Sequence, residues 1–305
     1  MSTVNMGNGI YVVVGGAFPR CNTLVVKSGE LVVVDPGCSV EALRSLLAGL
    51  DLELRNIDTI ILSHIHPDHI TNTMRLNRLS KCRIAANEIT APLFNNKEEM
   101  KRFLGFKEGH PVRRLWEQMV NERMHGALDE GRVDEVLSDG DKIALNDLTL
   151  KMVMTPGHLP DHMCVEITEP RYIFGADIDC TPFGPFYGHP NSSIESFKET
   201  IRKLQETHYS CLISGHLEKP AVDDYKSALR DSLAHFDTRE EKVLRAVRNG
   251  ARSINDIMVN PIIYPSLSSP VMLQFERWMV EHHVASLIRH GRLVESERDT
   301  ILPAD

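Results

Sequence analysis

The chain lacks several features that would place a protein in a special class. Its formal net charge of −8 over 305 residues leaves no excess of basic residues, which argues against a surface built for phosphate backbones. Its six cysteines contain no C-x-x-C pair, and no apolar run approaches the roughly 20 residues that a membrane-spanning helix needs. The first residues show no basic segment followed by an apolar run. These absences predict a soluble, cytoplasmic protein with reduced thiols.

The composition is that of an ordinary globular protein, with 42% hydrophobic and 25% charged residues. Short apolar runs that read as strands form two series along the chain, and each series is one round. β-branched residues dominate the apolar runs, and Gly and Pro close them, as strands require. Each round also carries a helix with one apolar face, predicted over 40–50 and 193–207. Two such rounds favour two sheets packed face to face with helices outside. The strands are predicted at 10–14, 24–26, 31–34, 59–62, 142–145, 148–154, 163–167, 172–174 and 211–213.

Residues 91–135 separate the two series of predicted strands and are rich in charged residues. We predict two helices in it, around 96–104 and 111–125. The segment is either a lid over one face of the domain or a plain helical connection packed on the sheet.

After residue 220 the composition becomes helical. Gly250 is a natural stop for one of these helices, and Ser253 is a natural N-cap for the next. Helices that end in a short hairpin are typical of a winged-helix module. The helices are predicted at 223–235, 239–247, 253–259 and 270–290, and the strand turn at 291–295.

The strongest chemical signal is the run Ser63-His64-Ile65-His66-Pro67-Asp68-His69, directly after a buried strand. Three imidazoles this close would repel one another if they were protonated, whereas a metal ion would use them, because neutral imidazole and carboxylate are good ligands for zinc or iron. In an extended chain, His64 and His66 project on the same side. Pro67 is favourable in a first helical turn, which would bring Asp68 and His69 to a second point nearby. The run therefore predicts a metal site.

Three further candidates follow strand ends. His158 comes after Thr155-Pro156-Gly157, and His216 comes after Ser214-Gly215, where small residues let the backbone turn sharply. Asp177 leaves its strand after Gly175-Ala176, and Asp179 is its rival. We favour Asp177 because its position at the strand exit matches that of the histidines.

These motifs resemble those of the metallo-β-lactamase superfamily, in the order that the family has them. Asp35, after Val32-Val33-Val34, resembles the family's first motif. The resemblance covers roughly residues 8–220 and implies an α/β fold, an αββα sandwich with metals at one edge between the sheets. We therefore expect a catalytic domain at 1–220, which contains the 91–135 insertion, and a C-terminal helical, winged-helix-like domain at 221–305.

The resemblance also implies a set of ligands for two divalent metal ions. Zinc is expected, with iron or manganese as alternatives, because all three accept histidine and carboxylate. Asp35 would act as an acceptor that orients a ligand histidine. The ligands divide between the ions as follows: His64, His66 and His158 hold one, Asp68, His69 and His216 hold the other, and Asp177 bridges both.

Two cations roughly 3.5–4 Å apart can share a water and lower its pKa enough to supply hydroxide at neutral pH. The bridging hydroxide would attack a carbonyl or phosphorus, and the metals would stabilise the oxyanion that develops. Asp68 is the expected catalytic proton-handling group, because it could hydrogen-bond the nucleophile while it binds a metal. The sequence therefore predicts a metal-dependent hydrolase.

Substrate recognition is assigned to the loop at 181–189, which is rich in aromatic and turn residues. Phe186, Tyr187 and His189 are predicted to line the pocket; the alternative for each is a side chain that only covers the sheet edge. The last motif reads Gly215-His216-Leu217, where relatives commonly have Gly-His-Gly, and a bulkier residue there would reshape the pocket.

The expected substrate is a small ester, thioester or related acyl compound. The alternative is an endoribonuclease that cleaves single-stranded RNA, since the subgroup of the superfamily that this chain resembles contains such an enzyme. A remote alternative is a diiron protein that binds or reduces oxygen, but flavodiiron relatives have a glutamate where His66 stands. Residues 221–305 hold 11 Lys and Arg against 13 Asp and Glu, and Glu276 and Glu281 lie on the helix that would read nucleic acid. We therefore expect this tail to pack against the rest of the protein or to form a homodimer rather than to bind nucleic acid. No membrane partner is expected.

Overall fold

The β-branched runs of the first half form a sheet whose inner strands are mostly buried on both faces. The computed structural model describes residues 2–16, 19–296 and 300–304, and this sheet has seven strands in chain order. Pairing is antiparallel from β1 to β4 and parallel from β4 to β7. The strands are β1 (Thr3–Gly7), β2 (Ile10–Val13), β3 (Thr23–Ser28), β4 (Glu30–Val34), β5 (Thr59–Leu62), β6 (Arg83–Asn87) and β7 (Glu135–Leu137).

The second round of strands forms a six-stranded sheet in the order β13-β12-β11-β10-β9-β8. Within it, β11 and β12 pair in parallel, and the other pairs are antiparallel. All the predicted strands are present in the two sheets, although β1, β6, β7 and β13 were not predicted. The strands are β8 (Lys142–Ala144), β9 (Thr149–Met154), β10 (Met163–Ile167), β11 (Tyr172–Ala176), β12 (Cys211–Ser214) and β13 (Ala221–Val222).

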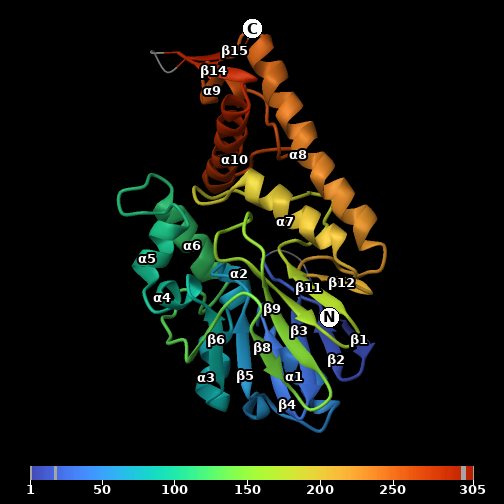
Figure 1. The fold of residues 1–305 in the computed structure, drawn as a ribbon. Coiled ribbons are helices and arrows are strands. Elements are labelled where there is room, and N and C mark those ends of the chain that lie inside the picture. The colour runs from blue at the N-terminus through green and yellow to red at the C-terminus, as the bar shows by residue number, and fades with distance from the viewer. Residues whose placement is uncertain (1, 17–18, 297–299, 305) are drawn as a thin grey trace.

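Side-chain alternation along the strands builds the layers. In β4, Val32 and Val34 belong to the core shared by the two sheets, while Leu31 and Val33 pack into the core under the helices outside. Because both faces are covered, the strand reads as a continuous apolar run. Figure 1 shows the result, two facing sheets with helices beyond them, so the predicted αββα sandwich is confirmed.

Helices cover the outer faces of both sheets. The predicted helices over 40–50 and 193–207 are confirmed as α1 and α7, and the side chains of Ser39 and Ser193 cap their N-termini. The insertion holds three helices rather than two, α4 being the one not predicted. The helices are α1 (Val40–Ala48), η1 (Leu54–Asn56), α2 (Pro67–Ile70), α3 (Thr73–Ser80), α4 (Thr90–Phe94), α5 (Lys97–Phe103), α6 (Arg113–Arg123) and α7 (Ile194–Glu206).

The C-terminal part contains α8 (Tyr225–Arg248), α9 (Ile254–Ile257), α10 (Pro270–Arg289) and the paired strands β14 (Leu293–Glu295) and β15 (Ile301–Pro303). The prediction of separate helices at 223–235 and 239–247 is wrong, because α8 runs through both. The intervening residues include no glycine or proline, and Phe236 and Arg239 are both buried, so packing continues across the expected break. Ser253 caps α9 as predicted. Both the winged-helix assignment and the two-domain division stay predictions.

Helix α10 is packed against its neighbours rather than presented to solvent. In Figure 1 it descends from the C-terminal end of the molecule to α7 and the insertion. Near the insertion, Trp278 meets Phe106 edge to face, and Phe106 stacks on Trp116 of α6 with ring centroids 4.5 Å apart. Of the described residues, no helix is long and apolar enough to cross a membrane.

Glu276, on the helix that would read nucleic acid, is fully buried. Its carboxylate accepts hydrogen bonds from the backbone N–H groups of Ile262 at 2.6 Å, Ile263 at 3.1 Å and Tyr264 at 3.1 Å. A buried acidic side chain is tolerated only when it is bonded in this way. Glu276 thus fixes the segment that precedes α10.

We predict that Glu276→Ala lowers the free energy of unfolding by about 3 kcal/mol, because it leaves three buried donors without an acceptor. Denaturant titration followed by circular dichroism measures this change. The control is Glu281→Ala on the same helix, whose half-exposed ion pair with Arg277 spans 3.9 Å and should contribute less than about 1 kcal/mol. Equal losses in the two variants would show that the three hydrogen bonds carry no special weight.

Candidate metal centre

The candidate ligands leave the ends of strands at one edge of the sandwich. His64 follows β5, and Asp177 and His216 follow the parallel neighbours β11 and β12. Gly215 lies so close to Ala176 that a Cβ there would meet the Ala176 carbonyl oxygen at 2.4 Å. Gly157, before His158, has φ +139°, and a Cβ there would meet the backbone of Phe197 at 2.2 Å. Only glycine allows these turns, which explains the small residues before each histidine.

The predicted metal-binding side chains converge on the carboxylate of Asp177. Its Oδ1 lies 2.7 Å from His69 Nε2 and 3.0 Å from His216 Nε2. Its Oδ2 lies 3.0 Å from His158 Nε2, 3.6 Å from His66 Nδ1 and 3.8 Å from His64 Nε2. The two oxygens therefore face two different groups of imidazoles.

These two groups are those into which the sequence divided the ligands. His64, His66, His158 and Asp177 have ligand atoms within 4.8 Å of one another, and so do Asp68, His69 and His216. Asp68 completes the second group, with Oδ2 3.7 Å from His216 Nε2 and 3.8 Å from His69 Nε2. Each group could hold a cation. Asp179, the rival of Asp177, belongs to neither group, although it lines the cavity above them.

Three of these imidazoles make a hydrogen bond through Nδ1, the ring nitrogen that does not face Asp177. His158 donates from Nδ1 to the Phe186 carbonyl oxygen at 2.8 Å. His69 Nδ1 lies 2.7 Å from Asp35 Oδ2, as the sequence predicted for Asp35. The Ser63 hydroxyl donates to Asp35 Oδ2 at 2.6 Å and accepts from His64 Nδ1 at 2.8 Å. Asp35 therefore orients His69 directly and His64 through Ser63.

This arrangement leaves lone pairs that a cation would satisfy. The neutral ring of His64 donates from Nδ1, so its Nε2 is an unprotonated acceptor that lies 3.8 Å from the acceptor Oδ2 of Asp177. His158 Nε2 lies 3.0 Å from the same oxygen and 2.9 Å from His66 Nδ1. His64 Nε2 is buried without a hydrogen-bond partner in the described structure. Acceptors facing acceptors in a buried site are unfavourable unless a positive charge lies between them, so the donor set fits a metal ion.

The ionisation of the cluster agrees with this fit. Burial holds the pKa of His64 well below its usual value and lowers that of His66 to about 3, helped by the neighbouring His158, so both rings are neutral. Burial would raise the pKa of Asp177, but the surrounding histidines, His69 first, hold it well below its usual range. Burial would lower the pKa of His216, yet the Asp177 carboxylate raises it to about 9. His216 would release its proton when a cation binds.

A cavity of about 590 Å³ opens above the cluster, with His66, Asp68, Asp177 and His216 in its wall. Phe186 and His189 line it as predicted. The expectation for Tyr187 is corrected: this side chain is fully buried and is not among the described residues that line the cavity. Leu217 is also not among the described residues that line it.

Tyr187 instead joins a buried network that fixes the loop at 181–189. Its hydroxyl lies 2.6 Å from His283 Nε2 on α10 and 3.1 Å from Arg239 Nη1 on α8. Arg239 also donates to the carbonyl oxygens of Phe183 and Pro185. The next carbonyl, that of Phe186, holds His158, so the C-terminal helices support a candidate ligand. No sequence signal pointed to this network, because a lone arginine or histidine in a helix has no pattern.

Two more supporting residues were also hidden in the sequence. Asp161 is buried, and its Oδ2 accepts from the Ile65 N–H at 2.8 Å and from the Thr90 hydroxyl at 2.9 Å, which joins the His64–His66 turn to the first residue of α4. His162 accepts from the Asp177 N–H at 3.2 Å, so it holds the backbone that carries this carboxylate. The available signal for Asp161 was an acidic residue three positions after the candidate ligand His158.

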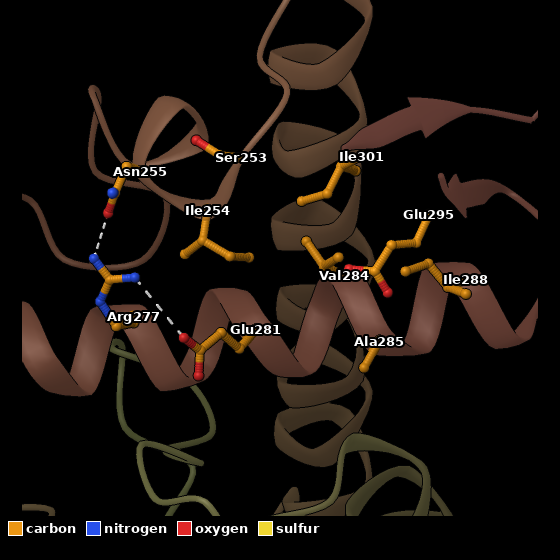
Figure 2. Close-up of a pocket in the computed structure, with 10 residues that line it drawn as sticks. All are labelled: Ser253, Ile254, Asn255, Arg277, Glu281, Val284, Ala285, Ile288, Glu295 and Ile301. Carbon is orange, nitrogen blue, oxygen red and sulfur yellow. Dashed lines mark hydrogen bonds and ion pairs between the residues drawn. The ribbon is translucent and has the colours of Figure 1, made fainter. Parts of the chain in front are cut away.

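A second cavity, of about 450 Å³, lies in the C-terminal part between α9, α10 and β15 (Figure 2). Arg277 crosses its mouth and contacts Asn255 and Glu281. The described residues that line it include no histidine or cysteine. The cavity at the histidine cluster is therefore the candidate functional site.

We predict that Asp35→Asn weakens metal binding by about 10- to 100-fold, because one amide oxygen cannot accept from the Ser63 N–H, the Ser63 hydroxyl and His69 as the two carboxylate oxygens do. Competition with a chromophoric chelator for zinc measures the affinity. The control is Asp58→Asn, since Asp58 also accepts a backbone N–H, from Leu31 at 2.7 Å, but lies outside the cluster. Unchanged zinc affinity in the Asp35 variant would refute the orienting role.

Solved structures share this fold over nearly the whole chain. A metallo-beta-lactamase family protein from Thermus thermophilus is 19% identical, with a TM-score of 0.77, over 98% of this chain and 100% of that one. A beta-lactamase domain protein from Burkholderia ambifaria is 16% identical, with a TM-score of 0.74, over 99% of this chain and 94% of that one. At these identities the likeness concerns the fold, and it includes the C-terminal helices.

Among curated proteins, an atrochrysone carboxyl ACP thioesterase from Aspergillus fumigatus is 24% identical over 233 residues. The match covers 75% of this chain and 60% of that relative's length. The family model described as the metallo-beta-lactamase superfamily matches residues 16–216, which contain every candidate ligand. The chain therefore belongs to the metallo-beta-lactamase superfamily.

Proposed function

We propose that this protein is a dinuclear metal-dependent hydrolase that acts on an ester, a thioester or a related acyl substrate. The observation that carries the proposal is the carboxylate of Asp177, whose two oxygens face two separate sets of ligand side chains beneath a cavity. His64, His66 and His158 would hold one ion, and Asp68, His69 and His216 the other. Zinc is the ion we propose, with iron and manganese as alternatives.

Two such ions, when bound, would lower the pKa of a water that they share and polarise the scissile carbonyl. The chain's own residues set the conditions for this chemistry. The imidazoles are fixed from behind by Asp35, Ser63 and the Phe186 carbonyl, so little reorganisation is needed when substrate binds.

Asp68 is the residue that we assign to proton transfer. Its carboxylate reaches the cavity and is 14% exposed, so it is accessible to a water or a leaving group there. Its Oδ2 faces the second group of imidazoles, which leaves Oδ1 able to accept a proton from the attacking water and return it to the leaving thiolate or alkoxide.

Two observations support an acyl substrate over RNA. Among the described residues that line the cavity, Arg20 is the only lysine or arginine, whereas Asp68, Asp177 and Asp179 are acidic. A phosphate backbone would find little positive charge there. The curated relative named a thioesterase is also consistent with acyl transfer to water.

We predict that chelation abolishes thioester hydrolysis and that adding back zinc, iron or manganese restores it. The measurement pairs metal content with the loss of thioester absorbance, and the panel includes lactones, phosphodiesters and single-stranded RNA. RNA cleavage with inert thioesters would contradict the assignment, and so would hydrolysis by protein with empty metal sites.

His66→Ala and Asp177→Ala should each reduce both metal content and turnover to background, because each removes a ligand from a buried site. The matched controls are His208→Ala and Asp237→Ala, whose side chains are exposed, and they should keep both. Full metal content in the Asp177 variant would contradict the bridging role.

A further inference from the structure

The cavity above the histidine cluster is polar at the cluster, where His66, Asp68, Asp177 and His216 form its wall. The rest of its lining is mostly apolar, and its other polar members are Arg20, Asp179, Thr181, His189 and Ser269. Aromatic and thioether side chains make up much of the remaining wall, and they come from segments far apart in the sequence. These are Trp116, Met119 and Met124 from the insertion, Phe183 and Phe186 from the loop at 181–189, and Tyr264, Val271, Met272 and Phe275 from the C-terminal part.

We propose that this wall binds a long or bulky apolar acyl group, with the scissile carbonyl at the metal centre and the chain between α6 and α10. The inference rests on the proposed acyl hydrolysis and adds the class of acyl group that is accepted. The cavity volume of about 590 Å³ lies within the roughly 300–1,000 Å³ typical of small-molecule binding pockets. A cavity of this size accommodates a ligand far larger than an acetyl group.

The apolar wall is held in place by contacts outside the cavity. Trp116 is buried and stacks on Phe106, which also meets Trp278 of α10. Arg239 holds the carbonyl oxygens of Phe183 and Pro185, and Glu276 holds the backbone of Tyr264. A wall fixed in this way is preformed, so it should discriminate among acyl groups by length.

Met119 and Met272 determine how long a chain the cavity accepts. Both are half-buried, one on α6 and one on α10, and both line the cavity. Their neighbours Leu115 and Leu273 lie on the same helices but are 46% and 44% exposed, and neither is among the described lining residues. The chain thus offers a control beside each specificity residue.

The first experiment compares kcat/KM for thioesters of one carrier thiol with acyl chains from acetyl to tetradecanoyl. We expect kcat/KM to rise about tenfold for each two added methylenes until the cavity is filled. Met119→Trp and Met272→Trp should shorten the preferred chain and lower kcat/KM for the decanoyl thioester by at least about tenfold, with the acetyl thioester unaffected. Leu115→Trp and Leu273→Trp should leave the whole profile unchanged.

The second experiment measures binding without turnover. The chain has two tryptophans, so Trp278→Phe leaves Trp116, on the cavity wall, as the sole indole reporter. Decanoate should change its fluorescence saturably in both the as-purified and the chelated protein, and butyrate should not do so at the same concentrations.

The two experiments separate failure of the inference from failure of the proposed function. Hydrolysis that is independent of chain length, with no decanoate binding, would overturn the apolar acyl site and leave the hydrolase intact. Decanoate binding with no hydrolysis of any thioester would support the apolar site and overturn the acyl-hydrolase assignment.

Discussion

The position of one carboxylate, that of Asp177, is the constraint on which the site depends. Its two oxygens face opposite groups of imidazoles, so all of the surrounding side chains must be placed relative to a single ionised group. Such crowding of acceptors is unfavourable in a buried site that holds no cation. The local fold holds the cluster together through hydrogen bonds on its far side, from Asp35, Ser63 and the Phe186 carbonyl.

The C-terminal part contributes to the site in two ways. Through Arg239 it holds the loop whose Phe186 carbonyl orients His158, and through α10 it supplies part of the cavity wall. Helix α10 is buried along much of its length, including the carboxylate of Glu276. These contacts support a role for the tail in shaping the site, since the helix that would read nucleic acid is engaged in packing.

The insertion and the tail meet across the cavity, although the whole second sheet lies between them in the chain. The stack of Phe106 on Trp116, with Trp278 at its edge, joins them. Of the two interpretations offered for residues 91–135, the structure favours a covering segment, because α6 forms part of the cavity wall. The buried aromatic contacts argue that this cover is fixed in place.

The sequence by itself determined most of the strands and helices, the αββα fold and the seven side chains that gather in the cluster. It could do so because ligand chemistry requires particular residue types and because strand ends are marked by small residues, as at Gly157 and Gly215. It failed where burial depends on distant partners. Continuous α8, buried Tyr187 and the roles of Arg239 and Asp161 follow from contacts between segments far apart in the chain. An apolar stripe such as that of Met119 or Phe275 looks the same whether it packs a core or lines a cavity, so only the tertiary structure decided which it does.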